Sequence, residues 1–333
     1  MRADLLHVVE SAYDLDGSGT RWLQGLTDAI GPLIDAGHGA YGTTIDASDL
    51  GRMNVGKVVC YRGDRAFVRA ILETNAALAR TEVKDTYRGT DAINTATERV
   101  GAARWNAIAR PHGPSAIRDC TAVVAADARG VGCMVIAPME RVHRYPARVK
   151  RVWARVVAHV VAMQRLRAGL AGASPRRRAE GEAVLSPGGA LEHAIGSASS
   201  GSARALLREA AVARERARGQ LRREAPEEAV EMWHALVAGR WSIVDRFDRD
   251  GRRFLIAHEN EPVAMGPRAL TARERQVVTQ VAMGHSNKLV AYELGLSVGA
   301  VSAYLNGAMR KLGLDSRLDL ARLVLAGARA AAR

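Results

Sequence analysis

Small, apolar and turn-forming residues between Leu270 and Leu325 are spaced as two short helices joined by a tight turn would require. Such a pair needs a small residue where the backbones touch, a residue tolerant of positive φ in the turn, and an apolar residue that locks the second helix onto the first. Ala291, Gly295 and Val301 provide these three in that order. The spacing therefore predicts a helix-turn-helix unit.

Capping residues indicate where these helices begin and end. Ser286 is placed to cap a helix over about 287–294, which Gly295 ends. Ser297 is placed to cap a second helix over about 298–312. Apolar residues recur at helical spacing: Val290 and Leu294 in the first helix, and Val301, Leu305 and Leu312 in the second.

Two further helices flank this pair. Val277, Val278, Val281 and Ala282 mark a scaffold helix before it. Ser316-x-x-Asp319 has the form of a capping box and predicts a helix after it. Leu318, Ala321 and Leu325 would then share one face of that last helix.

The segment resembles the LuxR-type helix-turn-helix domain of bacterial transcription regulators. The resemblance covers about one fifth of the chain and implies an all-α domain over 266–333 that binds double-stranded DNA. A packing unit of three or four helices with no nucleic-acid role is the alternative, but apolar periodicity alone does not require the polar landmarks. The shared landmarks are Leu270-Thr-x-Arg-Glu274, Gly284-x-Ser-Asn-Lys288, Ala291-x-x-Leu294-x-Leu296-Ser297, Val301, Lys311-Leu312-Gly313 and Ser316-Arg317.

The resemblance also implies which residues meet DNA. Asn306 is the most informative of them, because its amide can form two hydrogen bonds with adenine; a solvated helix position is the alternative. Relatives usually carry Thr, Lys and His where this chain has Ala300, Ser302 and Tyr304, so nonspecific affinity should be weaker and less salt-dependent. Base edges would be read near Ser302, Ala303 and Asn306, and phosphates would be contacted by Lys288, Ser297, Tyr304, Arg310 and Lys311.

Composition predicts a cytoplasmic protein of two or three domains, given 333 residues with 48% hydrophobic content. The chain has no run of about 18 apolar residues, and its start does not match a signal peptide, so no membrane association is expected. Cys60, Cys120 and Cys133 are odd in number and unclustered. We therefore expect no structural disulfide, no metal site and no cofactor.

The net charge of +13 is unevenly distributed. Residues 141–223 hold 18 lysines and arginines against 5 acids, residues 268–333 hold 10 against 4, and the rest of the chain holds 20 against 26. A basic middle and a basic C-terminal domain suit a protein that meets DNA phosphates. For the middle block, a solvated helix face and a linker remain the alternative.

Residues 1–170 are expected to form an α+β domain. An amphipathic helix over 21–34 precedes the strand-like runs, and a long amphipathic helix follows Pro146. This order loosely resembles a GAF- or PAS-type sensory domain, in which a helix leaving the sheet carries a signal toward an output domain. The sequence does not specify a small-molecule ligand for it. The strand-like runs are 40–45, 57–61, 121–126 and 133–137, the last two separated by a turn at 127–130.

The long helix carries a stripe of Val149, Val152, Val156 and Val160. The stripe is compatible with two arrangements. It could pair two subunits, so that a homodimer aligns two C-terminal domains on a palindromic site. It could instead pack onto the sheet of its own domain.

Residues 171–189 have the composition of a basic linker, and residues 190–262 predict a small α+β unit, itself PAS-like. Within the unit, two helices around Pro226 precede a hairpin of 241–247 and 253–258. We expect this unit to lie next to the DNA-binding domain.

The fold class is therefore α+β, with a GAF/PAS-like N-terminal region followed by an all-α LuxR-type domain. The function expected is sequence-specific transcription regulation without catalysis, with RNA polymerase as a candidate partner. The alternative is a nucleotide-hydrolysing or catalytic switch targeted to DNA. Gly51 to Val58 approaches a phosphate-binding loop, but Val58 replaces the hydroxyl that would hold Mg²⁺ and a strand-like run follows. A sigma-like factor would need a separate promoter-melting domain, which the sequence does not indicate.

Overall fold

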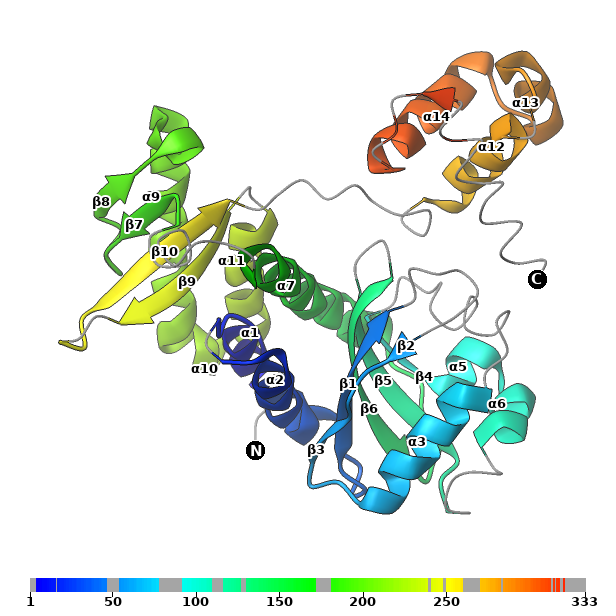
Figure 1. Ribbon diagram of the computed structural model, residues 1–333, viewed down its shortest axis with the longest axis horizontal. Helices are drawn as coiled ribbons and strands as arrows, with labels where there is room; N and C mark the ends of the chain where they lie inside the picture. The colour runs from blue at the N-terminus through cyan, green and yellow to red at the C-terminus, as the bar shows by residue number, and fades with distance from the viewer. Residues whose placement is uncertain are drawn as a thin grey trace.

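The computed structural model combines helices with two antiparallel sheets (Figure 1). No helix in the part of the chain that it describes is long and apolar enough to cross a membrane. The residues described are 4–15, 17–46, 54–77, 92–109, 116–126, 130–171, 181–238, 241–247, 250–259, 270–282, 284–312, 314, 316–317 and 320.

The first sheet has the strand order β2-β1-β6-β5-β4, with β3 also paired to β1. The four predicted strand-like runs all lie in it, as β1, β3, β5 and β6. β4 was not predicted, because three residues are too few to show an alternating pattern. The strands of the first sheet are β1 (Ala40–Asp46), β2 (Asn54–Val55), β3 (Val59–Tyr61), β4 (Ile93–Thr95), β5 (Asp119–Ala126) and β6 (Val131–Met139). Of the turn predicted at 127–130, residues 127–129 lie outside the described part.

Helices cover both faces of this sheet. On β1, Tyr41 and Gly42 point to opposite faces, as neighbouring strand residues do. The Tyr41 ring contacts Phe67 of α3, whereas Gly42 leaves no room for a side chain beside Thr27 of α2. α3 and α2 therefore lie on opposite faces. The helices of this region are α1 (Leu5–Ala12), α2 (Gly19–Ile34), α3 (Arg65–Ala77), α5 (Ala96–Val100), α6 (Ala102–Ala109) and α7 (Ala147–Ala171).

The second sheet has the order β8-β7-β10-β9, and its connecting helices fall between β8 and β9. The predicted hairpin and the two helices around Pro226 are confirmed. The linker prediction is wrong for residues 181–189, because β7 lies there and pairs with β10 far along the chain. The elements are β7 (Ala183–Leu185), β8 (Leu191–Ala194), the 3₁₀ turn η1 (Gly196–Ser199), α9 (Gly201–Arg216), the π-helical turn η2 (Ala217–Leu221), α10 (Arg222–Glu224), α11 (Pro226–Ala238), β9 (Trp241–Phe247) and β10 (Arg253–Glu259).

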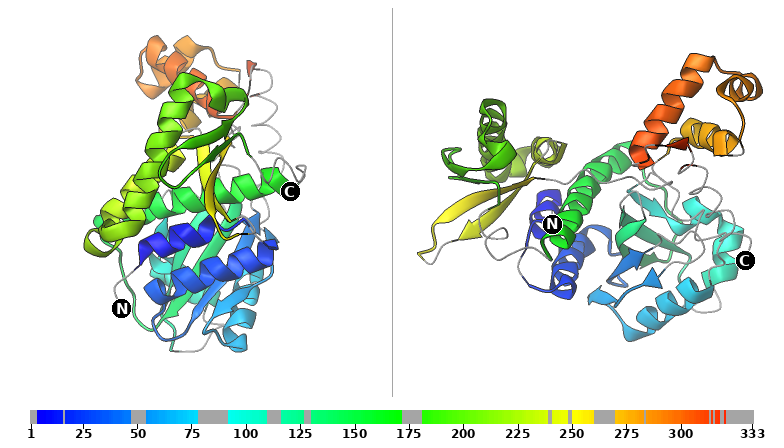
Figure 2. Two further views of the ribbon diagram at one scale, coloured as in Figure 1. Left: turned by 90° about the vertical axis from the view of Figure 1, so that its left-hand side faces the viewer. Right: turned by 45° about the horizontal axis from the view of Figure 1, so that its top comes forward.

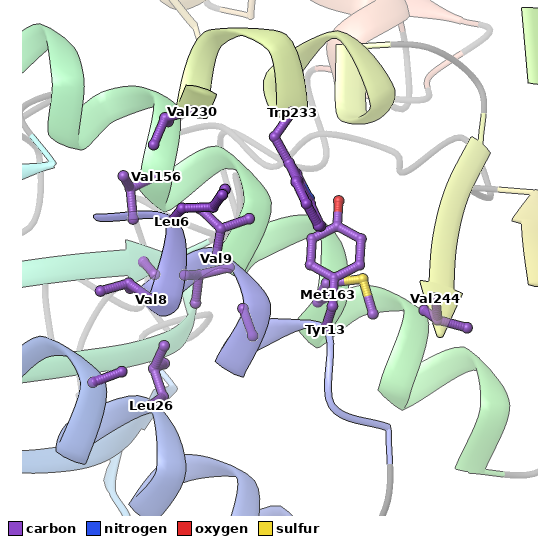
Figure 3. Packing of buried hydrophobic residues seen from close by; sticks show 14 of the residues in the cluster. Leu6, Val8, Val9, Tyr13, Leu26, Val156, Met163, Val230, Trp233 and Val244 are labelled. Atoms are coloured by element: carbon purple, nitrogen blue, oxygen red, sulfur yellow. The ribbon is translucent and has the colours of Figure 1, made fainter. Parts of the chain in front are cut away.

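One hydrophobic core joins the two sheets (Figure 3). Tyr13, just after α1, and Met163 of α7 pack with Trp233 of α11, and Val244 of β9 lies beside them. The small unit therefore packs against α1 and α7. The expectation that it also lies next to the DNA-binding domain stays a prediction. Apolar side chains of the unit cover apolar sides of these two helices and bury them.

The valine stripe of α7 is part of this core. Val152, Val156 and Val160 are 6%, 0% and 1% exposed. The prediction that the stripe pairs two subunits is therefore wrong, since the side chains it needs are already covered. The alternative, packing within the chain, is correct, and the cover includes α1 and α11 as well as the first sheet.

A row of arginines at every fourth position reinforces the same junction. Arg214 is fully buried, donates to Asp245 Oδ2 at 2.6 Å, and stacks 4.6 Å from the centre of the Trp233 ring. Arg218 donates to Asp245 and, at 2.8 Å, to Glu10. Burial lowers the pKa of Arg214 to about 10. Part of the basic middle of the chain is thus neutralised inside the fold and does not face solvent.

Asp245→Asn should destabilise the protein by about 3 kcal/mol, because it leaves the buried guanidinium of Arg214 without a countercharge. Urea denaturation followed by tryptophan fluorescence measures the change. Glu231→Gln is the matched control: it breaks the more exposed pair with Arg155 and should cost at most about 1 kcal/mol. Equal losses in the two variants would contradict a special role for the buried pair.

Candidate nucleic-acid interface

The helices α12, α13 and α14 lie close together (orange in Figure 2). Their buried side chains form a hydrophobic core of their own. α12 (Ala272–Ala282) precedes α13 (Asn287–Leu294) and α14 (Val298–Leu312). The predicted ranges 287–294 and 298–312 are confirmed. The core side chains are Leu270, Val277, Val278, Val281, Val290, Ala291, Val301, Leu305, Ala308, Leu312 and Leu320. Of the predicted fourth helix, residues 318–319 and 321–333 lie outside the described part.

Backbone caps hold the turn between α13 and α14. The Ser286 hydroxyl accepts from Leu289 N at 3.3 Å, which confirms the predicted start of α13. Gly295 ends α13 with a left-handed φ of 63°, a conformation that favours glycine. Leu296 N then donates to Ala291 O at 2.9 Å. The Ser297 hydroxyl accepts from Ala300 N at 3.1 Å, as predicted for the cap of α14.

One side of α14 faces the core and the opposite side faces solvent. Val301, Leu305, Ala308 and Leu312 are buried at helical spacing. The exposed residues Gly299, Ala303, Asn306 and Arg310 follow the same spacing about half a turn away. We call these four residues the reading stripe.

Five of the eight expected DNA-contact residues lie at the surface. Ala303, Asn306 and Arg310 are on the reading stripe, Lys288 is exposed in the first turn of α13, and Ser297 is exposed at the start of α14. The Ser297 hydroxyl uses its oxygen as a cap, which leaves its O–H able to donate to an anion.

The other three expected residues have contacts inside the domain. Ser302 Oγ donates to Val298 O and accepts from Asn287 Nδ2, both at 3.0 Å. Tyr304 is half-buried against the core. Lys311 Nζ donates to Glu274 Oε2 at 2.7 Å. Spacing along one helix could not show this, because the contacts depend on which side of α14 meets α12 and α13.

Glu274 links α12 to α14, and it is not among the eight residues expected to contact DNA. Its carboxylate accepts from Thr271 N at 2.7 Å, and Glu274 N donates to the Thr271 hydroxyl at 3.2 Å, forming a capping box for α12. The same oxygen receives Lys311 from the last turn of α14. The Thr-x-x-Glu spacing was the available signal.

The surroundings of Glu274 favour its charged form. Burial alone would raise the pKa of this carboxyl, but the hydrogen bonds from Lys311 and Thr271 outweigh burial and lower the pKa below its usual value. Gly307 of α14 explains how the carboxylate fits, since a Cβ there would lie 3.1 Å from Glu274 Oε1. The ion pair thus fixes the angle at which α14 lies on α12.

The segment that approaches a phosphate-binding loop has a different fold. Residues 51–53 lie outside the described part, and after Lys57 the chain enters β3. The loop motif requires a helix N-terminus at that point, where backbone N–H groups and the helix dipole bind phosphate. Elsewhere in the described ranges, His, Cys, Asp and Glu form no group of three suited to a metal ion.

Comparisons with known proteins agree with this geometry. Residues 268–324 match the family model for bacterial regulatory proteins of the luxR family. The HTH-type transcriptional activator RamA of Corynebacterium glutamicum is 44% identical over 50 residues, which is 15% of this chain and 18% of RamA. The transcriptional regulatory protein UhpA of Escherichia coli is 43% identical over 58 residues, 17% of this chain and 30% of UhpA.

Residues 268–324 are therefore a LuxR-family helix-turn-helix domain. The chain matches less than a third of the length of either relative.

Glu274→Gln should loosen α12 and α14 at neutral pH by roughly 1–2 kcal/mol, because a charge-assisted hydrogen bond is lost. Because the pKa of Glu274 is lowered, the wild-type carboxylate stabilises the folded domain fully at pH values above 4.5, the ordinary pKa of this carboxyl. This stabilisation is lost as the pH falls through the lower pKa of the folded state. Hydrogen exchange of peptides from both helices, at neutral pH and below pH 4, measures the effect. The difference between wild type and variant should shrink in acid.

The control is Glu293→Gln, which removes a more exposed carboxylate paired with His285 at 3.3 Å. It should change exchange little in α12. Faster exchange of α12 to the same extent in both variants would contradict the role assigned to the Glu274–Lys311 pair.

Proposed function

We propose that the protein is a sequence-specific DNA-binding transcription regulator whose α14 lies in the major groove of double-stranded DNA. The reading stripe carries this proposal, because it places Ala303 and Asn306 on the solvent side of a helix fixed by a serine cap and an ion pair. The first turns of such a helix are the part that reaches base edges. The luxR-family match over 268–324 supports the same function.

Within this proposal the exposed residues divide by chemistry. Ala303 and Asn306 read bases, since a methyl group and an amide suit base edges. Lys288, Ser297 and Arg310 contact phosphates, which fix position without reading sequence. Ser302, Tyr304 and Lys311, with their internal contacts, act by orienting α14, and any DNA contact they make is secondary.

We further propose that residues 4–259 are a GAF/PAS-like region that senses a signal or mediates dimerisation. Strand orders β2-β1-β6-β5-β4 and β8-β7-β10-β9 support two such domains, because in each sheet helices lie, along the chain, between the two edge strands. A homodimer would place two reading helices on one palindromic site. Its surface is not the valine stripe of α7, which is buried. RNA polymerase is the partner that a regulator of this type would affect, and the cytoplasm is where it would meet DNA.

Two substitutions in the full chain separate base reading from phosphate contact. Asn306→Ala should cost roughly 1–3 kcal/mol at one base position and relax the preference there. Lys288→Ala should weaken binding to all sequences about equally and lower the salt slope by about one unit. Electrophoretic shifts with a selected site and with unrelated DNA, at several salt concentrations, measure both effects.

Lys57→Ala is the matched control, because it removes an exposed lysine outside the helix-turn-helix domain and should leave the salt slope unchanged. If the wild-type chain does not bind DNA, or binds it with an affinity that salt does not change, the DNA-binding function is rejected. Loss of affinity in Asn306→Ala without any change in base preference would reject only the role of Asn306.

A further inference from the structure

The reading stripe is small and uncharged over the first three turns of α14. Gly299 and Ala303 offer no polar side chain, Asn306 offers one amide, and the first cation of α14 is Arg310 in the last turn. Guanine is read most often by arginine or lysine, thymine by apolar contact with its methyl group, and adenine by asparagine or glutamine. The available chemistry therefore favours A·T pairs.

Gly299 has no packing reason to be glycine within the described part of the domain. A Cβ built there would meet only Ser297 Oγ, at 3.9 Å, which is an ordinary contact. Glycine in a helix costs about 1 kcal/mol relative to alanine. Gly307, in the same helix, differs because Glu274 occupies the space beside it. The missing side chain at Gly299 thus opens space only toward the outside, on the stripe that would face DNA.

We propose that Gly299 lets the first turn of α14 approach the base edges closely, so that the Ala303 methyl contacts a thymine methyl and Asn306 bonds the adenine of a neighbouring pair. The inference rests on the proposed function and specifies its DNA target. Ala303 and Asn306 are separated by about 4.5 Å along the helix axis. One base-pair step is about 3.4 Å, so the two side chains reach adjacent pairs. Each half-site then contains two neighbouring A·T pairs.

The first experiment selects duplexes bound by the full chain from a random-sequence library. Adjacent A·T pairs should appear in the selected half-site. Replacing the contacted thymine by deoxyuridine removes only its methyl group and should weaken binding about fourfold, the effect of exposing one buried methyl-sized group. Ala303→Gly should weaken binding to the thymine site and abolish the difference between thymine and uracil sites.

The second experiment tests close approach. Gly299→Ala should lower DNA affinity about tenfold or more, because the added methyl holds the helix away from the bases, while thermal stability stays equal or rises. Gly25→Ala is the matched control: Gly25 is an exposed glycine of α2 that also has open space for a Cβ. It should stabilise the chain to a similar extent and leave DNA affinity unchanged.

The outcomes distinguish this inference from the function on which it rests. Failure to select any sequence, together with no salt-dependent DNA binding, would overturn the proposed function. A selected site with G·C pairs at these positions, or equal affinity for thymine and uracil sites, would overturn the A·T reading alone. Unchanged affinity in Gly299→Ala would overturn close approach.

Discussion

The helix α7 is buried on several sides, by the first sheet, by α1 and by α11, and these contacts hold residues of both sheets together. α7 leaves the first sheet and contributes Val156 and Met163 to a core that also contains Tyr13, Trp233 and Val244. Neither sheet covers its apolar face alone, so each depends on α7 and on α1 beside it. Residues 4–171 and 181–259 are thus linked by a shared core, and a change in the packing of one region is felt by the other.

The ion pairs at this junction add orientation to apolar contact. Because Arg214 is buried, its guanidinium must keep both Asp245 and the face of Trp233 in place. Arg222 extends the row by donating to Asp4 and Glu10 at the chain's N-terminal helix. The basic side chains of this chain therefore have two roles. Some cations hold the fold, and others, such as Lys288, remain at the surface.

Local patterns were predictable and distant partners were not. The ends of α13 and α14 follow from Ser286, Gly295 and Ser297, because caps act within a few residues. β7 was not predicted, because three residues are too few to show an alternating apolar pattern and its partner β10 lies far along the chain. In the site, the family resemblance implied a surface position for Asn306, and the structure has it exposed. The contact of Lys311 with Glu274 was not implied, since it depends on how two helices cross.

Gly295 and the short turn around it limit how the LuxR-family domain can be regulated. The turn of residues 295–297 is short. It has a backbone hydrogen bond from Leu296 to Ala291 and a serine cap at its end, so the connection between α13 and α14 is rigid. Asn287 of α13 also donates to Ser302 of α14 at 3.0 Å, so bending one helix relative to the other would break this hydrogen bond. Under the proposed function, a signal from the rest of the chain would then have to move the domain as a rigid body. Such a movement would change how many copies reach the DNA, or the distance between them, and would leave the shape of the reading helix unaltered.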